Sequence, residues 1–399
     1  MGRYPPFHEV NAVSTVSLAI SERCKNMFKP LLFVAAFAIL SLGFHFQRER
    51  LFPSSYHPAP STGSTQDHAL SPNSIQAIYN STLGFGDIYM INMPGRTDKL
   101  DALRLLTSVT NISYTVVPGI DGKEIPHVAW PGFYKEDLAS RTGSWRAHMN
   151  AAASILDNNL SSALIVEDDA DWDVSLKTQL TQFALGSRHI LNTPAFSEPR
   201  SPYGDGWDML WLGHCAQDPP SKPLARFFIA NDTTMPPAGR RWGLWNPEEM
   251  LTYDILHNHT TRVVYRPAGG VCSYAYALSY TGAQKMLYHL SYSHFDGPFD
   301  VGQAGLCKRG RKGEIDYSCV GVYPGLIHAV FGENDIVYDP TKPRKERENK
   351  KGTPSAPNLV FGVRENVRNL IEGKELVGRW QGEEEIGEME MWFDEGKGD

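Results

Sequence analysis

Residues 163–173 read Ala-Leu-Ile-Val-Glu-Asp-Asp-Ala-Asp-Trp-Asp, and this stretch decides the fold class. Its first four residues form the apolar run expected of a strand that is buried on both faces of a parallel sheet. Open α/β sheets keep their ligand sites at the carboxyl ends of such strands. The acidic residues of the stretch follow the run at that end: Glu167, Asp168, Asp169, Asp171 and Asp173.

Five carboxylates within seven positions indicate a site for a hard divalent cation. Oxygen ligands are those that Mg²⁺ and Mn²⁺ prefer, and a metal held there can neutralise a diphosphate leaving group. The alternative reading is a solvated acidic turn, because clusters of charged residues are common on protein surfaces.

The length and charge of the chain restrict the class of protein. With 399 residues, the chain is long enough for one α/β domain of catalytic size with appendages. Its net charge of -7 argues against a nucleic-acid partner, which would require a basic surface.

A membrane anchor is predicted near the N-terminus. Residues 31–44 are apolar and uncharged, and we expect a transmembrane signal anchor at 29–47 after a cytosolic tail at 1–28. A cleaved signal peptide is the alternative. Asn-x-Ser/Thr sequons occur only after this span, which favours a single-pass type II protein of the Golgi or the endoplasmic reticulum with a luminal catalytic domain. The sequons are at Asn80, Asn111, Asn159, Asn231 and Asn258.

The rest of the chain divides into three parts. Residues 48–83 have the composition of a flexible stem, 84–340 alternate strand and helix patterns, and 341–399 form a charged extension. Strands are expected at 87–92, 114–117, 163–166, 208–212 and 273–279, and an amphipathic helix at 145–156. This alternation predicts a parallel sheet with right-handed crossovers.

Four cysteines follow the predicted anchor. An even number in an oxidising compartment permits two disulfides, and we predict that Cys307 pairs with Cys319. Four unpaired buried thiols are the alternative. The other two cysteines are Cys215 and Cys272.

Several motifs occur in an order and spacing that resemble glycosyltransferase family 25, the lipopolysaccharide and collagen galactosyltransferase type. They are Ile88-Tyr89-Met90-Ile91-Asn92 with Arg96, Gly119-Ile120-Asp121-Gly122, Gly143 with His148, Ile165-Val166-Glu167-Asp168-Asp169, and Pro298-Phe299-Asp300-Val301. The resemblance covers residues 86–340, and we expect a membrane-anchored eukaryotic member, of fungal origin. Ser144 and Ala147 stand where the family usually has other residues, so no role is carried over to them.

The resemblance implies a GT-A-like nucleotide-sugar-binding fold with a mostly parallel central sheet. It also implies transfer of a hexose, usually galactose from UDP-galactose, with inversion and with Mn²⁺ or Mg²⁺. The acceptor would be a glycan or a glycoprotein. The insertions at 182–207 and 219–258 would shape the acceptor pocket, so the family does not identify that acceptor.

Site roles follow from this resemblance and from the chemistry. Asp169 is expected to bind the metal directly, with Asp171 and the late His328 as further candidate ligands. Asp300 is the expected general base, with Asp296 as its alternative. The expected donor contacts are Asn92, Arg96, Asp121, His148, Glu167 and Asp168.

Each of these roles has a simpler alternative. For Asp300 it is a helix cap, for Arg96 a solvated first-turn residue, and for Asp121 an Asx-turn residue. For His148 it is a hydrogen-bonded core histidine. A catalytically inactive luminal binding protein and a metal-dependent hydrolase are the competing functions.

Overall fold

The computed structural model describes residues 74–132, 139–194, 199–218, 225–237, 240–241, 260–293, 297–330, 356 and 358–380. All of them belong to one of two compact units, Ser55–Asp399. The predicted tail and anchor lie outside the described residues. None of the helices in the described ranges is long and apolar enough to cross a membrane.

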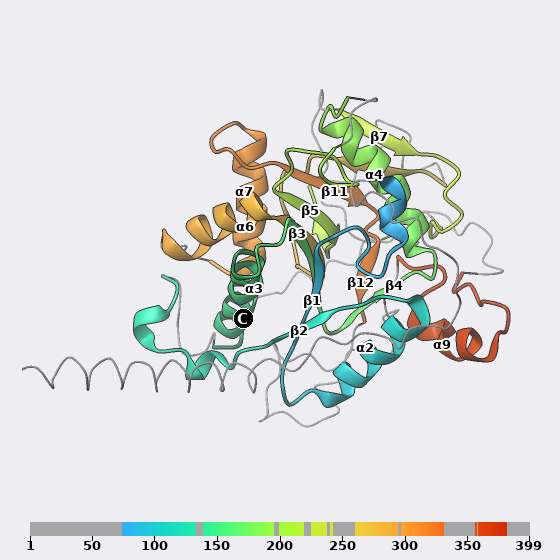
Figure 1. Ribbon diagram of the computed structural model, residues 1–399, viewed down its shortest axis with the longest axis horizontal. Helices are drawn as coiled ribbons and strands as arrows, with labels where there is room; N and C mark the ends of the chain where they lie inside the picture. The colour runs from blue at the N-terminus through green and yellow to red at the C-terminus, as the bar shows by residue number, and fades with distance from the viewer. Residues whose placement is uncertain are drawn as a thin grey trace, which may run out of the picture. The chain divides into compact units, whose positions relative to one another are not determined.

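An eight-stranded sheet forms the centre of this unit, with the strand order β2-β1-β3-β10-β5-β11-β8-β7 (Figure 1). Only β10 and β8 run against the other strands. The sheet is therefore mixed, with most strands in one direction. The strand bounds are β1 (Asp87–Asn92), β2 (Thr115–Pro118), β3 (Ser162–Glu167), β5 (Met209–Gly213), β7 (Arg226–Ile229), β8 (Arg262–Tyr265), β10 (Ala275–Ser279) and β11 (Cys319–Tyr323).

The predicted mostly parallel sheet is confirmed, but the parallel order that the strand-helix alternation predicts is wrong at β10. The sequence predicts a strand there, and the structure has one, but β10 pairs antiparallel with both β3 and β5. A short strand that is buried on both faces has the same apolar composition in either direction, so the residues alone do not reveal its orientation.

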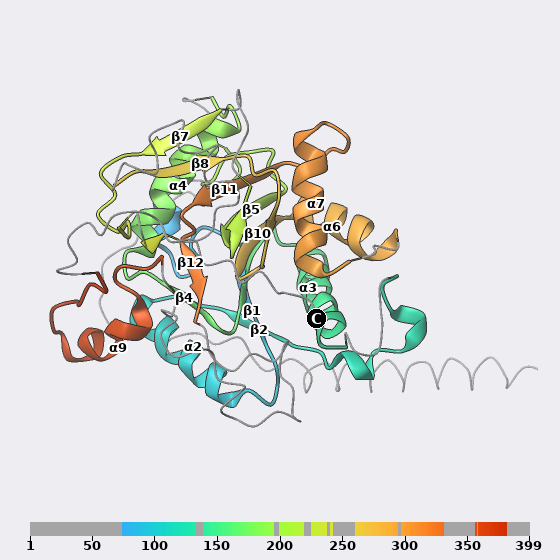
Figure 2. The same ribbon diagram turned by 180° about the vertical axis from the view of Figure 1, so that it is seen from behind.

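The two faces of the sheet bury two separate cores, because side chains alternate along each strand. Leu164 and Val166 of β3 belong to one core, and Ala163 and Ile165 belong to the other. Helices α2 (Thr97–Thr110), α4 (Leu176–Ile190) and α9 (Val363–Glu372) contribute to the first core. Helices α3 (Ala139–Asp157), α6 (Tyr280–Leu287) and α7 (Phe299–Arg311) cover the second core, as the reverse view shows (Figure 2).

The predicted amphipathic helix is confirmed as part of α3, whose Trp145, Met149 and Ala152 are buried. Order begins earlier than the predicted stem boundary, since a 3₁₀ helix, η1, covers Ile75–Tyr79. Ile78 and Leu83 are completely buried in the first core, which explains why this segment joins the fold.

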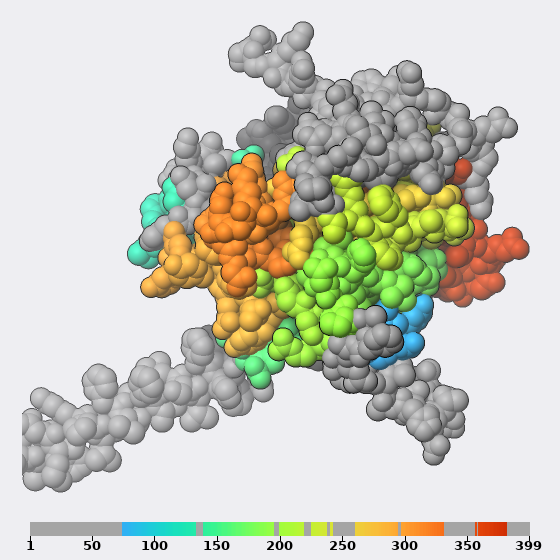
Figure 3. All heavy atoms as spheres, turned by 90° about the horizontal axis from the view of Figure 1, so that it is seen from above, coloured from blue at the N-terminus to red at the C-terminus, as the bar shows by residue number. Residues whose placement is uncertain are grey.

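Helices α4 and α7, green and orange in Figure 3, reach the surface.

Smaller elements surround the sheet. Strand β4 (Ala170–Trp172) pairs antiparallel with β12 (Ile327–Ala329), and β6 (Ala216–Gln217) pairs with β9 (Gly270–Val271). The short helices are η2 (Gly122–Glu124), η3 (His127–Ala129) and the π-helix η6 (Tyr288–Tyr292).

The described residues contain two disulfides. The predicted pair Cys307–Cys319 is confirmed and joins α7 to β11. The other two cysteines form Cys215–Cys272, which links the β6 and β9 segments. The alternative of four unpaired thiols is wrong.

Candidate functional site

The carboxyl ends of two neighbouring parallel strands bring the first predicted site residues together. In the register of β1 with β3, Ile91 is opposite Glu167. The next residue on each strand, Asn92 and Asp168, is therefore at the same edge of the sheet. The Asn92 Nδ2 donates to Asp168 Oδ2 at 2.8 Å, and both residues are buried.

A lysine that the sequence reading missed completes this contact. Lys99 Nζ is 2.7 Å from Asp168 Oδ1, and it comes from the first turns of α2, which follows β1. The two partners keep little solvent exposure, so the ion pair is largely shielded from water. The sequence signal for it is a basic residue in the first turn of the helix that follows a strand ending in a site residue.

Arg96 contacts this cluster through its backbone carbonyl. Its carbonyl accepts a hydrogen bond from Asn92 Nδ2 at 3.2 Å. Its guanidinium binds Asp98 with two bonds, at 2.9 and 2.8 Å, and this contact holds the pKa of Asp98 down at about 2.

Glu167 is connected to the second core through His148. His148 Nε2 lies 3.2 Å from Glu167 Oε1, and Nδ1 lies 2.9 Å from the Tyr276 hydroxyl. Burial raises the pKa of Tyr276 well above its usual value, so its hydroxyl keeps its proton. The His148 ring stacks on Phe299 with a centroid distance of 4.1 Å.

Both readings of His148 therefore apply in part. It is a buried core histidine, only 2% exposed, and its hydrogen bond fixes a predicted site residue. Its burial leaves Glu167, with a side chain that is 25% exposed, as the member of the pair that faces outward.

Asp169 is the least compensated acid of the run. Its Oδ1 is buried and has no hydrogen-bond partner in the described part of the chain. Burial, followed by the neighbouring charge of Glu167, raises the pKa of Asp169 to about 7. An orphaned carboxylate oxygen next to a second acid is an arrangement that a bound cation would stabilise.

The other two predicted metal ligands point elsewhere. Asp171 Oδ1 accepts hydrogen bonds from the backbone N–H groups of Trp172 and Arg364, at 2.9 and 3.2 Å. His328 Nε2 donates to the Gly325 carbonyl at 3.3 Å. Across the described ranges, no three His, Cys, Asp or Glu side chains converge as a metal site. Of the three predicted ligands, Asp169 is the one with a buried carboxylate oxygen that has no hydrogen-bond partner among the described residues.

Two further predicted residues make capping contacts. Asp121 Oδ1 accepts from Lys123 N at 2.9 Å at the start of η2, which is the Asx-turn alternative. Asp300 accepts from Val301 N at 2.9 Å and from Cys272 N at 3.0 Å, at the N-terminus of α7. Asp296 lies outside the described residues.

Asp300 lies near enough to Tyr274 for its charge to act on that phenol. Burial is the main cause that raises the pKa of this phenol well above its usual value. The remaining causes are the charges of three nearby carboxylates: Asp169, Glu167 and Asp300. Tyr274 directly precedes β10, and its carbonyl accepts the Glu167 N–H at 3.0 Å. Asp169, Glu167 and Asp300 therefore all act on the same buried phenol.

Similar proteins give this site a context. Over 116 residues the chain is 28% identical to procollagen galactosyltransferase 2 of Mus musculus, a match that covers 26% of this chain and 18% of that protein. It is 23% identical over 144 residues to procollagen galactosyltransferase 1 of Danio rerio, covering 33% and 22%. The human procollagen galactosyltransferase 2 is 24% identical over 115 residues, covering 26% and 18%. The chain is a distant relative of glycosyltransferases.

These matches are partial. The chain spans about a fifth of the length of the curated relatives it matches. No protein-family model matches it. Among solved structures, mannose-1-phosphate geranyltransferase from Thermus thermophilus aligns with a TM-score of 0.22 and 13% identity, over 64% of this chain and 80% of the other.

Proposed function

We propose that this chain is a GT-A-like glycosyltransferase that transfers a hexose, galactose from UDP-galactose, to a glycan or glycoprotein acceptor with inversion and with the help of Mn²⁺ or Mg²⁺. The similarity to procollagen galactosyltransferases supports the reaction class. The observation that carries the proposal is the orphaned Asp169 carboxylate at the carboxyl end of β3, beside Glu167.

The donor would bind at the edge formed by β1, β3 and α2. Asp169 would hold the divalent cation, with Glu167 beside it, and the cation would neutralise charge on the diphosphate. Lys99 adds a second positive charge, and Asn92 and Lys99 together fix both oxygens of Asp168. Each Asp168 oxygen keeps a further lone pair, which can accept a hydrogen bond from a ribose hydroxyl.

Inversion requires a base that removes the proton of the acceptor hydroxyl as that oxygen attacks the anomeric carbon. Asp300 is the proposed base. The N–H groups of Cys272 and Val301 each hold one of its oxygens, which fixes the carboxylate and leaves a second lone pair on each oxygen for the acceptor proton.

We further propose that the catalytic unit is luminal, in the Golgi or the endoplasmic reticulum, behind the N-terminal anchor. The two disulfides support this, because disulfides persist in oxidising compartments and are rare in the cytosol.

Thermal unfolding of the full chain, purified in detergent from a secretory host, tests the proposal. Mn²⁺ with UDP-galactose should stabilise the wild type by about 2.7 kcal/mol at one hundred times the dissociation constant. Asp169→Asn should remove this stabilisation. Asp101→Asn is the matched control, since Asp101 lies on the exposed side of α2 with its side chain 70% exposed.

Slow hydrolysis of UDP-galactose should accompany the stabilisation and should also be lost in Asp169→Asn. Donor binding without hydrolysis or transfer would support the inactive binding protein instead. A wild type that neither binds nor hydrolyses any nucleotide sugar would overturn the proposal.

A further inference from the structure

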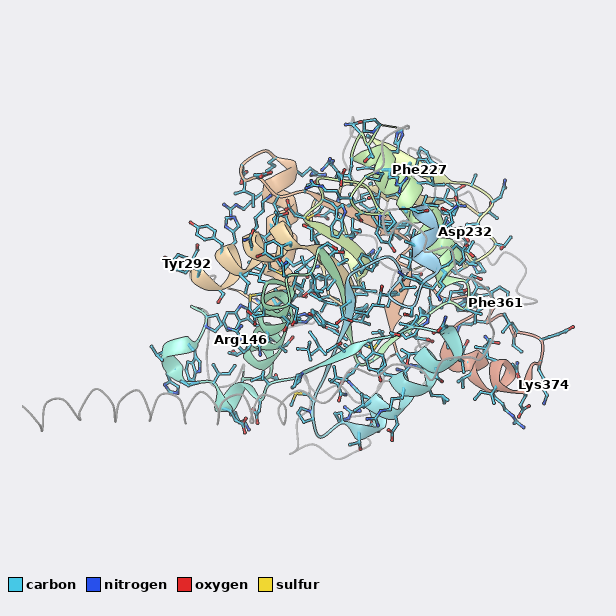
Figure 4. All side chains as sticks on the ribbon, in the orientation of Figure 1. Arg146, Phe227, Asp232, Tyr292, Phe361 and Lys374 are labelled. Atoms are coloured by element: carbon cyan, nitrogen blue, oxygen red, sulfur yellow. A yellow bond between two sulfur atoms is a disulfide. The ribbon has the colours of Figure 1, made fainter. Side chains whose placement is uncertain are left out.

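The predicted charged extension at 341–399 contains a folded C-terminal segment, residues 358–380. Val363 and Asn366 of α9 are completely buried. The Asn366 side chain accepts the Val377 N–H at 2.7 Å and donates to the Val377 carbonyl at 3.1 Å. Arg379 N donates to the Val360 carbonyl at 2.9 Å, so the segment folds back on itself. Figure 4 labels Phe361 and Lys374, which lie before and after α9.

This segment binds the second half of the acidic run. Val174 N donates to the Phe361 carbonyl at 3.0 Å, and Phe361 N donates to Asp173 Oδ2 at 2.8 Å. Asp171 accepts the backbone N–H of Arg364, as described above. The acidic run therefore has two parts. Asp171 and Asp173 bind the C-terminal segment by hydrogen bonds, and the acids before them belong to the proposed site.

Arg364 reaches closest to the site acids. Its Nη2 donates to the Ala170 carbonyl at 3.2 Å, and Ala170 directly follows Asp169. On the other edge of β4, Val330 N donates to the Asp169 carbonyl at 2.8 Å, and Ala329 pairs with Ala170. The backbone that carries Asp169 is thus held between β12 on one side and the C-terminal segment on the other.

The same segment also contacts the helix that carries Lys99. Helix α9 packs against both α2 and β4 (Figures 1 and 2). A displacement of α9 would therefore move both elements that present charge to the donor edge.

We propose that the C-terminal segment is a positioning element for the acidic site, and that Arg364 is its positioning residue, acting through the Ala170 carbonyl on the orientation of Asp169. The catalytic role of Asp169 rests on the function proposed above. A misplacement of about 1 Å in a reacting geometry can cost on the order of a hundredfold in rate, so a clamp on this backbone matters for activity.

The test compares three variants of the full chain. Arg364→Met keeps the aliphatic stem and removes the donors, and Arg364→Lys keeps one donor. Arg368→Ala is the matched control, because Arg368 is on the same helix, is 80% exposed, and binds only Glu372 among the contacts the structure describes.

The first readout is hydrogen exchange of the metal-free protein, which does not depend on activity. Arg364→Met should speed exchange of the Val174 and Val330 amides about tenfold, whereas Arg368→Ala should leave it unchanged. Equal exchange in all variants would overturn the positioning role even if the protein proves to be inactive.

The second readout is the Mn²⁺ concentration for half-maximal hydrolysis of UDP-galactose. Arg364→Met should raise it about tenfold, and Arg364→Lys should recover most of the loss. A fall in kcat without any change in the Mn²⁺ requirement would overturn the proposal. If the wild type shows no Mn²⁺ or donor dependence, the proposed function fails, and the exchange measurement alone then decides the role of the segment.

Discussion

Two buried histidines should each lower the free energy of unfolding in mild acid. His214 follows β5 and donates from Nε2 to the Val322 carbonyl at 3.0 Å, and His328 lies in β12. Both are almost completely buried. Burial lowers the pKa of His214 from 6.5 to about 4, and burial, with the neighbouring His214 as the next cause, lowers that of His328 to about 3.

The direction of the effect follows from proton uptake. Below pH 6.5 the unfolded chain binds protons on both histidines while the folded chain does not, so the free energy of unfolding falls with pH. The fall in the free energy of unfolding that His214 causes ends near pH 4, its folded pKa, and the fall that His328 causes ends near pH 3. At pH 5 each histidine should cost about 2 kcal/mol, and together about 4 kcal/mol, relative to pH 7.

Urea denaturation at pH 7 and pH 5 measures this cost. The comparison is between the wild type and the double variant His214→Gln, His328→Gln, in which glutamine keeps an N–H donor but does not titrate. Buried acids with raised pKa values, such as Asp171, gain protons in the same range and act in the opposite direction. They are common to both proteins, so the difference isolates the histidines. If both proteins lost equal stability between the two pH values, the reasoning would be refuted.

Three other outcomes are expected. Asp232→Asn removes the carboxylate that lies 2.7 Å from the buried Arg262, and should lower the free energy of unfolding in urea by about 3–5 kcal/mol. Adding Arg262→Met should restore part of that stability, and a loss below about 1 kcal/mol in the single variant would contradict the prediction. Lys99→Met should weaken UDP binding about tenfold or more in calorimetric titration, because charge-assisted contacts contribute about 1.5–3 kcal/mol. Unchanged binding would show that Lys99 does not contribute to the donor site. Replacing Cys307 and Cys319 by serine removes a disulfide with a sequence separation of 12, and the chain-entropy relation predicts a loss of about 3 kcal/mol in the free energy of unfolding. An unchanged urea unfolding curve would contradict this prediction.

The sequence was most predictive where local pattern and topology agree. The apolar run at 163–166 predicted β3, and the parallel pairing of β3 with β1 brings Asn92 and Asp168, two of the predicted site residues, into contact. The Cys307–Cys319 pair followed from short spacing and an even cysteine count.

What the sequence did not reveal depends on distant partners. Asp171 and Asp173 looked like members of one metal site, but their hydrogen-bond partners in the C-terminal segment lie 193 and 188 residues further along the chain. No local pattern indicates such a partner. Lys99 was missed for a related reason, since only the path of α2 past the end of β3 brings its amine to Asp168.

The position of β11 has a consequence for biosynthesis. It lies between β5 and β8, although it follows both in the chain, so the sheet stays in two pieces until residues 319–323 have been synthesised. Pairings between distant residues form slowly and leave strand edges exposed meanwhile. A nascent chain that stops after β10 would present the bare edges of β5 and β8 to chaperones, and β4 would still lack β12.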